Sequence, residues 1–189
     1  MGQQDSRDSP CVLNCLAPSM AWRRPSDPAN LFSPPVLLGS LGLSGFAPIL
    51  RGTSGTAVAA LGLALWAYLA APPSWQMLAA GGLLALLAII VGEWATARGE
   101  AGDDPDWFVL DEAAAMALIL GMTQAATLPD FCFAFVVFRF YDIAKPWPAS
   151  SFEHLPRSAG ILMDDLAAAC LGSWTIWTVR LLVNEAPIR

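Results

Sequence analysis

Residues 56–92 read TAVAALGLALWAYLAA, PPS and WQMLAAGGLLALLAIIVG, and this stretch contains no charged side chain. A helix needs about 20 mostly apolar residues to cross the hydrocarbon core of a bilayer. The runs 56–71 and 75–92 approach that length, and the Pro72-Pro73-Ser74 turn separates them because proline cannot continue a helix. We therefore predict two transmembrane helices joined by a tight turn.

Further apolar segments follow along the chain. Residues 113–128 and 166–183 are predicted spans, whereas residues 131–143 form a shorter aromatic segment. Residues 31–50 are apolar but interrupted by prolines and glycines, and lipid tolerates such broken backbone only where other protein covers it. We predict an all-α, integral membrane helical bundle of about four to five spans, preceded by a broken re-entrant or interfacial segment.

The composition also favours a membrane protein. Of the 189 residues, 56% are hydrophobic and 14% are charged, and the mean hydropathy is +0.52, whereas soluble proteins average about 25% charged residues. The net charge of −6 argues against nucleic acid as a partner, because phosphate backbones bind basic surfaces. Residues 1–30 are predicted to be a disordered polar tail and residues 31–189 a single membrane domain. Nothing in the sequence specifies an oligomeric partner.

Basic residues predict the orientation of the chain, because connections rich in Lys and Arg stay in the cytoplasm. The 72–74 turn has none, whereas the tail and other connections carry Arg23, Arg24, Arg51, Arg98 and Arg157. This orientation places the charged motifs together at the cytoplasmic face. Tryptophans near the predicted span ends are typical of an interfacial aromatic belt; they include Trp66, Trp75, Trp94, Trp107 and Trp147.

Three charged motifs adjoin the apolar segments. They read DPDWFVLDE (104–112), FRFYDIAKPWP (138–148) and GILMDD (160–165). Ionisable groups at a membrane boundary are costly unless they are paired, hydrated or bound to metal. The motifs contain five acids that abut apolar helices and so require positive partners: Asp111, Glu112, Asp142, Asp164 and Asp165.

Bases in the same region indicate what these acids bind. Arg139, Asp142 and Lys145 are spaced three apart, so a helix would place them on one face. Two bases cannot neutralise five carboxylates, and the deficit suits one or two Mg²⁺ ions, which prefer carboxylate, water and phosphate oxygens. Arg139 and Lys145 would then bind phosphate. The structural alternative is a charged helix end paired with itself, with acids that merely favour a helix N-terminus.

The Gly52-Thr53-Ser54-Gly55 turn opens the first span. Glycines and hydroxyls at a helix start can present N–H groups to an anion, so we expect Thr53 to assist in binding phosphate. An ordinary turn with a helix cap accounts for the same residues equally well.

In combination, these motifs resemble the phosphatidylglycerophosphatase A family. The similarity covers residues 37–183 and includes Val109-Leu110-Asp111-Glu112, Lys145-Pro146-Trp147-Pro148 and Gly160-Ile161 with Asp164-Asp165. It implies a bacterial inner-membrane enzyme that hydrolyses the terminal phosphate of a membrane phospholipid, phosphatidylglycerophosphate, to give phosphatidylglycerol with Mg²⁺. It also implies that the site consists of the five acids, as catalytic and metal-binding residues, and of Arg139 and Lys145.

Two other classes of function stay open. A carboxylate-lined membrane transporter also needs intramembrane acids, but it spreads them through the depth of the bilayer. A non-catalytic membrane scaffold descended from such an enzyme is expected to lose part of the charged set, which this sequence keeps. The clustering of the acids therefore favours the phosphatase.

Overall fold

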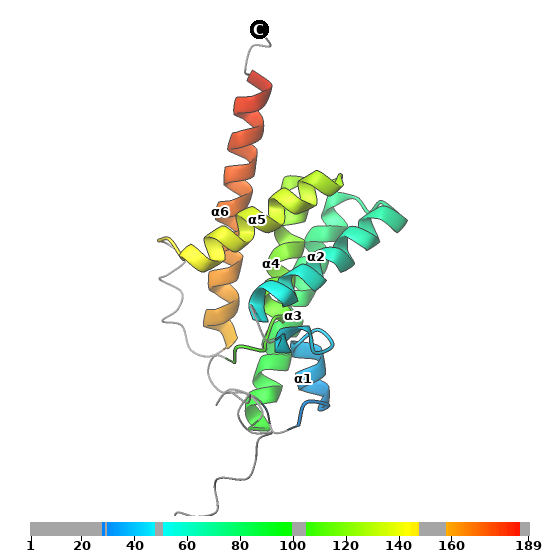
Figure 1. Ribbon diagram of the computed structural model, residues 1–189, viewed down its shortest axis with the longest axis vertical. Coiled ribbons are helices and arrows are strands. Elements are labelled where there is room, and N and C mark those ends of the chain that lie inside the picture. The colour runs from blue at the N-terminus through cyan, green and yellow to red at the C-terminus, as the bar shows by residue number, and fades with distance from the viewer. Residues whose placement is uncertain (1–27, 29, 48–50, 100–104, 148–157, 186–189) are drawn as a thin grey trace, which may run out of the picture.

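The computed structural model describes residues 28, 30–47, 51–99, 105–147 and 158–185. Within them the chain is all-α, as predicted (Figure 1). Its elements are α1 (Pro34–Gly39), the 3-10 helix η1 (Ser44–Phe46), α2 (Arg51–Ala70), α3 (Ser74–Ala97), α4 (Leu110–Thr123), α5 (Leu128–Ala144) and α6 (Ser158–Glu185). The predicted tail lies outside the described residues, apart from residues 28 and 30.

Three helices are long and apolar enough to cross a membrane: Gly52–Ala70, Ser74–Ala97 and Leu162–Val183. They correspond to three of the predicted spans. The predicted span 113–128 is wrong in its bounds, since α4 ends at Thr123 and a separate helix begins at Leu128. With 14 residues, α4 extends about 21 Å at 1.5 Å per residue, short of the ~30 Å hydrocarbon core.

Turn chemistry explains the break between α4 and α5. Gln124 takes a left-handed conformation with φ of 52°, which ends α4. Thr127 then caps α5, because its hydroxyl accepts from the Asp130 backbone N–H while the Asp130 carboxylate accepts from the Thr127 N–H. This reciprocal capping box is a strong start signal for a helix.

Side chains from α6 hold the end of α4. Arg180 donates to the Thr123 carbonyl and lies 2.9 Å from Asp130 Oδ1, and Trp177 Nε1 donates to the Met122 carbonyl at 3.0 Å. The last carbonyls of a helix lack partners within the helix. Arg180 and Trp177 therefore provide hydrogen-bond donors for the last carbonyls of α4, and these contacts join α4, α5 and α6 at this end of the bundle.

α4 is the central helix of the bundle. It contacts α2, α3, α5 and α6, and it lies behind the oblique pair α2 and α5 (Figure 1). Glycines allow close packing against α3: a Cβ at Gly81 would lie 3.2 Å from the Ala114 carbonyl oxygen, and one at Gly121 would lie 2.9 Å from the Leu78 nitrogen. Small residues at such contacts are the usual means of close helix packing in membranes.

The predicted broken segment is confirmed as discontinuous, with α1, a left-handed turn and η1 in succession. It packs on residues 105–109, which lead into α4. The Gly39 carbonyl accepts from Val109 N at 2.9 Å, and a Cβ at Gly45 would fall 2.0 Å from the Trp107 carbonyl oxygen. Only glycine fits at residue 45, and its close approach fixes the path of the chain into α4.

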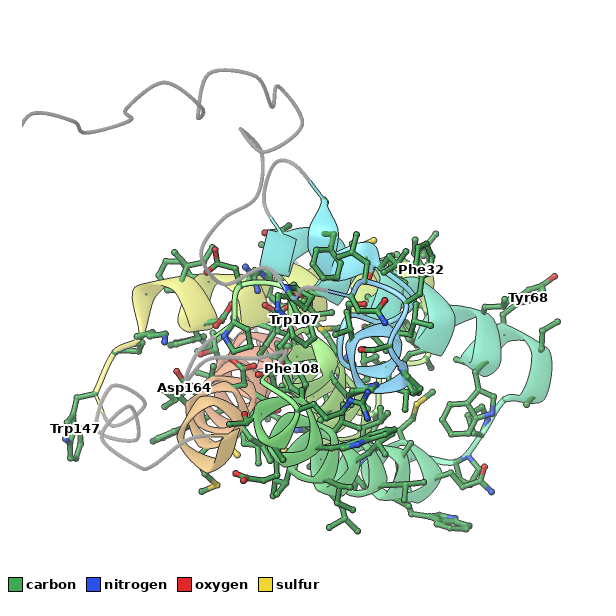
Figure 2. The ribbon with its side chains drawn as sticks, turned by 90° about the horizontal axis from the view of Figure 1, so that it is seen from below. Phe32, Tyr68, Trp107, Phe108, Trp147 and Asp164 are labelled. Carbon is green, nitrogen blue, oxygen red and sulfur yellow. The ribbon has the colours of Figure 1, made fainter. Side chains whose placement is uncertain are left out.

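Trp107 does not belong to the predicted aromatic belt. Its side chain is fully buried and stacks on Phe46 with 5.8 Å between ring centroids. Figure 2 shows it inside the bundle, whereas Tyr68 and Trp147 project from the edges. Trp75, Trp94 and Trp147 are exposed, as the belt requires. Trp107 is instead the core residue that holds η1 against the start of α4.

Candidate active site

The predicted site residues lie at the ends of four helices. Those from α2 and α4 lie in the first turn, those from α6 lie about two turns after its start, and those from α5 lie in its last two turns or directly after it. They are Thr53 on α2, Asp111 and Glu112 on α4, Arg139, Asp142 and Lys145 on or after α5, and Asp164 and Asp165 on α6. The acids therefore gather at one end of the bundle, unlike the dispersed acids expected of a transporter.

The Arg139 side chain contacts residues of α2, α4 and α5. Its Nη1 lies 3.1 Å from Glu112 Oε1 and 2.5 Å from Asp142 Oδ2, and its Nη2 donates to Thr53 Oγ1 at 3.2 Å. Only 14% of the side chain is exposed. Among the described residues, its buried Nε has no hydrogen-bond partner. The guanidinium fork thus connects two carboxylates and a hydroxyl from three helices.

Glu112 is enclosed by the first turns of α2. Its Oε2 contacts Thr56 Oγ1, which also donates to the Gly52 carbonyl at 2.8 Å and accepts from Arg139 Nη1 at 3.2 Å. A Cβ at Gly52 would lie 2.5 Å from Glu112 Oε1. Residues 52–55 are therefore the first helical turn of α2 rather than a preceding turn, which corrects the sequence interpretation.

Lys145 departs from the predicted shared face. The i,i+3 ion pair of Arg139 and Asp142 confirms part of that face, but α5 ends at Ala144 and Lys145 takes φ of 39°. This left-handed conformation directs its side chain to α6, where Nζ lies 2.7 Å from Asp164 Oδ2. Figure 2 shows Asp164 on α6. Lys145 thus joins α6 to the end of α5.

Asp111 and Asp165 each stand beside an acid that pairs with a base, Glu112 and Asp164 respectively. The side chains of Asp111 and Asp165 are both buried. Asp111 Oδ1 accepts from the Glu112 backbone N–H at 2.9 Å. Arg139 joins Glu112 to Asp142, and Lys145, three residues further on, joins Asp164, so the five predicted acids lie in one region although they come from three helices.

The two acids of α4 precede its apolar part and lie outside the three candidate spans. Burial raises the pKa of Glu112 to about 7 against the opposing effect of Arg139. Burial and the neighbouring Glu112 carboxylate raise the pKa of Asp111 well above its usual value. Both carboxyls are costly to ionise in this environment, so a nearby cation would stabilise their charged forms.

The donor chemistry fits Mg²⁺. Every acid offers oxygen ligands, and Asp164 Oδ1 is buried without a hydrogen-bond partner in the described part of the chain. Among the described residues, no three acidic, histidine or cysteine side chains are grouped closely enough to hold a metal by themselves. Mg²⁺ usually keeps several waters and uses one or two carboxylates plus substrate phosphate oxygens.

Sequence reasoning missed Thr56 and the packing role of Gly52. Thr56 is fully buried between Arg139 and Glu112. It lies three residues after Thr53, so the two hydroxyls share a helix face. That spacing would have identified Thr56 if residues 52–55 had been taken as helical.

Comparisons with known proteins agree with the motifs. The family described as Phosphatidylglycerophosphatase A matches residues 37–180. A putative phosphatidylinositol-3-phosphatase of Bacteroides thetaiotaomicron is 32% identical over 160 residues, which are 79% of this chain and 96% of that protein. The phosphatidylglycerophosphatase A of Escherichia coli is 29% identical over 140 residues, 72% of this chain and 77% of that protein. No solved structure matches significantly.

Proposed function

Because the chain belongs to the phosphatidylglycerophosphatase A family, and is therefore a lipid phosphatase, we propose that it hydrolyses the terminal phosphomonoester of phosphatidylglycerophosphate. The product would be phosphatidylglycerol. The observation that carries this proposal is the joining of Glu112, Asp142 and Thr53 by one guanidinium, beside a cluster of further acids. Charged groups in this arrangement suit the positioning and charge stabilisation on which phosphoryl transfer depends.

A second substrate is favoured by one comparison. The relative that this chain nearly covers from end to end is named as a putative phosphatidylinositol-3-phosphatase. Both lipids present a phosphomonoester on a polar headgroup, so the charged cluster alone does not favour one of them. Phosphatidylinositol 3-phosphate is therefore the second candidate.

The acidic cluster is proposed to hold Mg²⁺. Its ligands would be drawn from Asp111, Glu112, Asp142, Asp164 and Asp165, with Asp164 foremost because its buried Oδ1 has no hydrogen-bond partner among the described residues. When bound, the ion supplies Lewis-acid polarisation of the phosphoryl group.

The bases are proposed to bind the substrate phosphate. Lys145 is the more accessible, with 39% of its side chain exposed against 14% for Arg139. Arg139 already contacts Glu112, Asp142 and Thr53, so it would reach phosphate by exchanging one of these partners while keeping the others in position. Thr53 would offer its hydroxyl beside the fork.

The topology is part of the proposal. We place the site at the cytoplasmic face of a bacterial inner membrane, with α2, α3 and α6 as spans and the shorter α4 packed among them. The basic connections support this orientation. The clustering of site residues at four helix ends is consistent with one membrane face.

The proposal is tested by phosphate release from purified protein in detergent. The substrates are phosphatidylglycerophosphate, phosphatidylinositol 3-phosphate and phosphatidic acid, each with Mg²⁺ or with a chelator. We expect the fastest release from phosphatidylglycerophosphate with Mg²⁺. Faster release from phosphatidylinositol 3-phosphate would assign the second candidate, and no release from any lipid would overturn the function.

A further inference from the structure

An apolar groove of about 500 Å³ lies between α1, α2 and α3, with Ala113 of α4 at its base. Its walls include Leu37 on α1, Val58 and Gly62 on α2, and Leu84 on α3, and every lining residue is apolar. The volume is within the range of about 300–1,000 Å³ that is usual for small-molecule sites. Water has no polar partner in such a groove, so an apolar ligand is the chemistry that it suits.

The groove begins beside the charged residues along α2 and α4. Ala113 at its base follows Glu112 in the chain, and Ala59 in its wall lies three residues after Thr56. Residues three apart are neighbours on one helix face, about 4.5 Å apart along the axis. A ligand with its polar end near Arg139 could therefore extend its apolar part into the groove without leaving the protein surface.

The groove also opens where lipid is expected. α2 and α3, which form two of its walls, are candidate membrane spans. The wall has space at Gly62, where an added Cβ would meet nothing within 4 Å. A flexible unbranched chain can enter such a groove sideways from a bilayer.

We propose that this groove binds an acyl chain of the lipid phosphate whose headgroup lies at Arg139, an inference that rests on the proposed function. Both the polar and the apolar parts of a single phospholipid are then matched by adjoining surfaces of the protein. An acyl chain gains no hydrophobic transfer energy by moving from lipid into an apolar groove. The contribution of the groove is instead to orient the headgroup and hold its phosphate at the charged cluster.

Gly62→Leu fills the groove and tests the proposal. Gly82→Leu is the matched control, because Gly82 also has nothing within 4 Å of an added Cβ but does not line the groove. Each variant is assayed on phosphatidylglycerophosphate with hexadecanoyl chains and with butanoyl chains. The corresponding phosphatidylinositol 3-phosphates are used if the wild type prefers that headgroup. Thermal unfolding in detergent identifies any variant that fails to fold, in which case Val58→Phe replaces Gly62→Leu.

We expect Gly62→Leu to lower kcat/KM for the long-chain lipid about tenfold, because the leucine side chain would occupy the space of the acyl chain. The short-chain lipid should be hydrolysed as by wild type, and Gly82→Leu should match wild type on both. The groove assignment would be overturned if Gly62→Leu and Gly82→Leu were equally active on the long-chain lipid. It would also be overturned if Gly62→Leu lost the same activity on the long-chain and the short-chain lipid. Neither result would affect the proposed function. A wild type that hydrolyses neither headgroup would instead overturn the proposed function.

Discussion

The backbone of Gly52 lies directly against the Glu112 carboxylate, so that a methyl group on residue 52 would fall 2.5 Å from Glu112 Oε1. The same methyl group would lie 3.4 Å from Arg139 Nη2. The first turn of α2 therefore packs closely against the charged site and limits where its side chains can lie. The position of Glu112 depends on the absence of a side chain on a different helix.

Gly52→Ala should displace Glu112 and lower kcat about a hundredfold, the usual cost of shifting a catalytic group by about 1 Å. The fold should persist, because alanine favours a helix interior over glycine by roughly 0.5–1 kcal/mol. Phosphate release and thermal unfolding are measured together. Gly82→Ala is the control, since that position has open space. Wild-type activity in Gly52→Ala would show that Glu112 can move without consequence.

Arg139→Lys should lower kcat about a hundredfold although the charge is kept. The guanidinium contacts Glu112 and Asp142 through Nη1 and Thr53 through Nη2, and an ammonium group cannot reproduce that fork. Arg180→Lys is the control, because Arg180 also pairs with an acid but at the opposite end of the bundle. Comparable activity of the two variants would contradict a role for the Arg139 fork.

Asp142→Asn should abolish turnover while the protein remains folded. The substitution removes one carboxylate of the proposed Mg²⁺ cluster, but Arg139 keeps Glu112 as a partner. The control is Asp130→Asn, which alters an ion pair outside the site and should keep kcat. Phosphate release at increasing Mg²⁺ concentration makes the measurement. Normal turnover in Asp142→Asn would exclude Asp142 from the catalytic set.

Asp130 should make stability depend on pH at the end of the bundle far from the site. The Thr127 hydroxyl, and less strongly Arg180, hold the pKa of Asp130 below its ordinary value of 3.8. A lowered pKa in the folded state means that its contribution is present above the unfolded pKa and is lost as pH falls through the folded pKa. Wild type should therefore melt slightly above Asp130→Asn at pH 7 but not in strong acid. A difference that persists in strong acid would contradict this linkage.

The orientation of the chain is tested by labelling single cysteines with an impermeant thiol reagent in intact cells. The native cysteines are first replaced, since Cys132 and Cys170 are exposed. A cysteine at Ser74, between α2 and α3, should react from outside, and one at Ser158, at the start of α6, should not. Reaction of both or the reverse pattern would break the proposal that the site faces the cytoplasm.

The long helices were predictable because their signal is carried by composition. Residues 56–71, 75–92 and 166–183 lie within α2, α3 and α6, apart from Ala71. The end of α4 was not predictable, because the apolar run 113–128 continues through the turn at Gln124 and contains no charged residue that would mark the turn. The capping box at Thr127 and Asp130 was the available signal, and it would have placed the boundary correctly.

The candidate site was predictable in its acids and bases but not in its geometry. Charged residues beside apolar helices are conspicuous in sequence, and the structure brings the predicted ones into one region. The left-handed turn at Lys145, which sends its side chain to Asp164, departs from the helical spacing. The burial of Trp107 depends on Gly45 and Phe46, which are distant in sequence. Such features arise from tertiary packing, which no local pattern encodes.

The convergence of three helix ends has an electrostatic consequence that involves no side chain. α2 and α4 begin beside the acidic residues, and α5 ends there. Each helix N-terminus carries roughly half a positive elementary charge from its aligned peptide dipoles. Two such termini give this end of the bundle a fixed positive field, while Lys145 follows the one negative terminus. Attraction for an anion should therefore persist in part when Arg139 or Lys145 is neutralised, because the backbone itself cannot be mutated away.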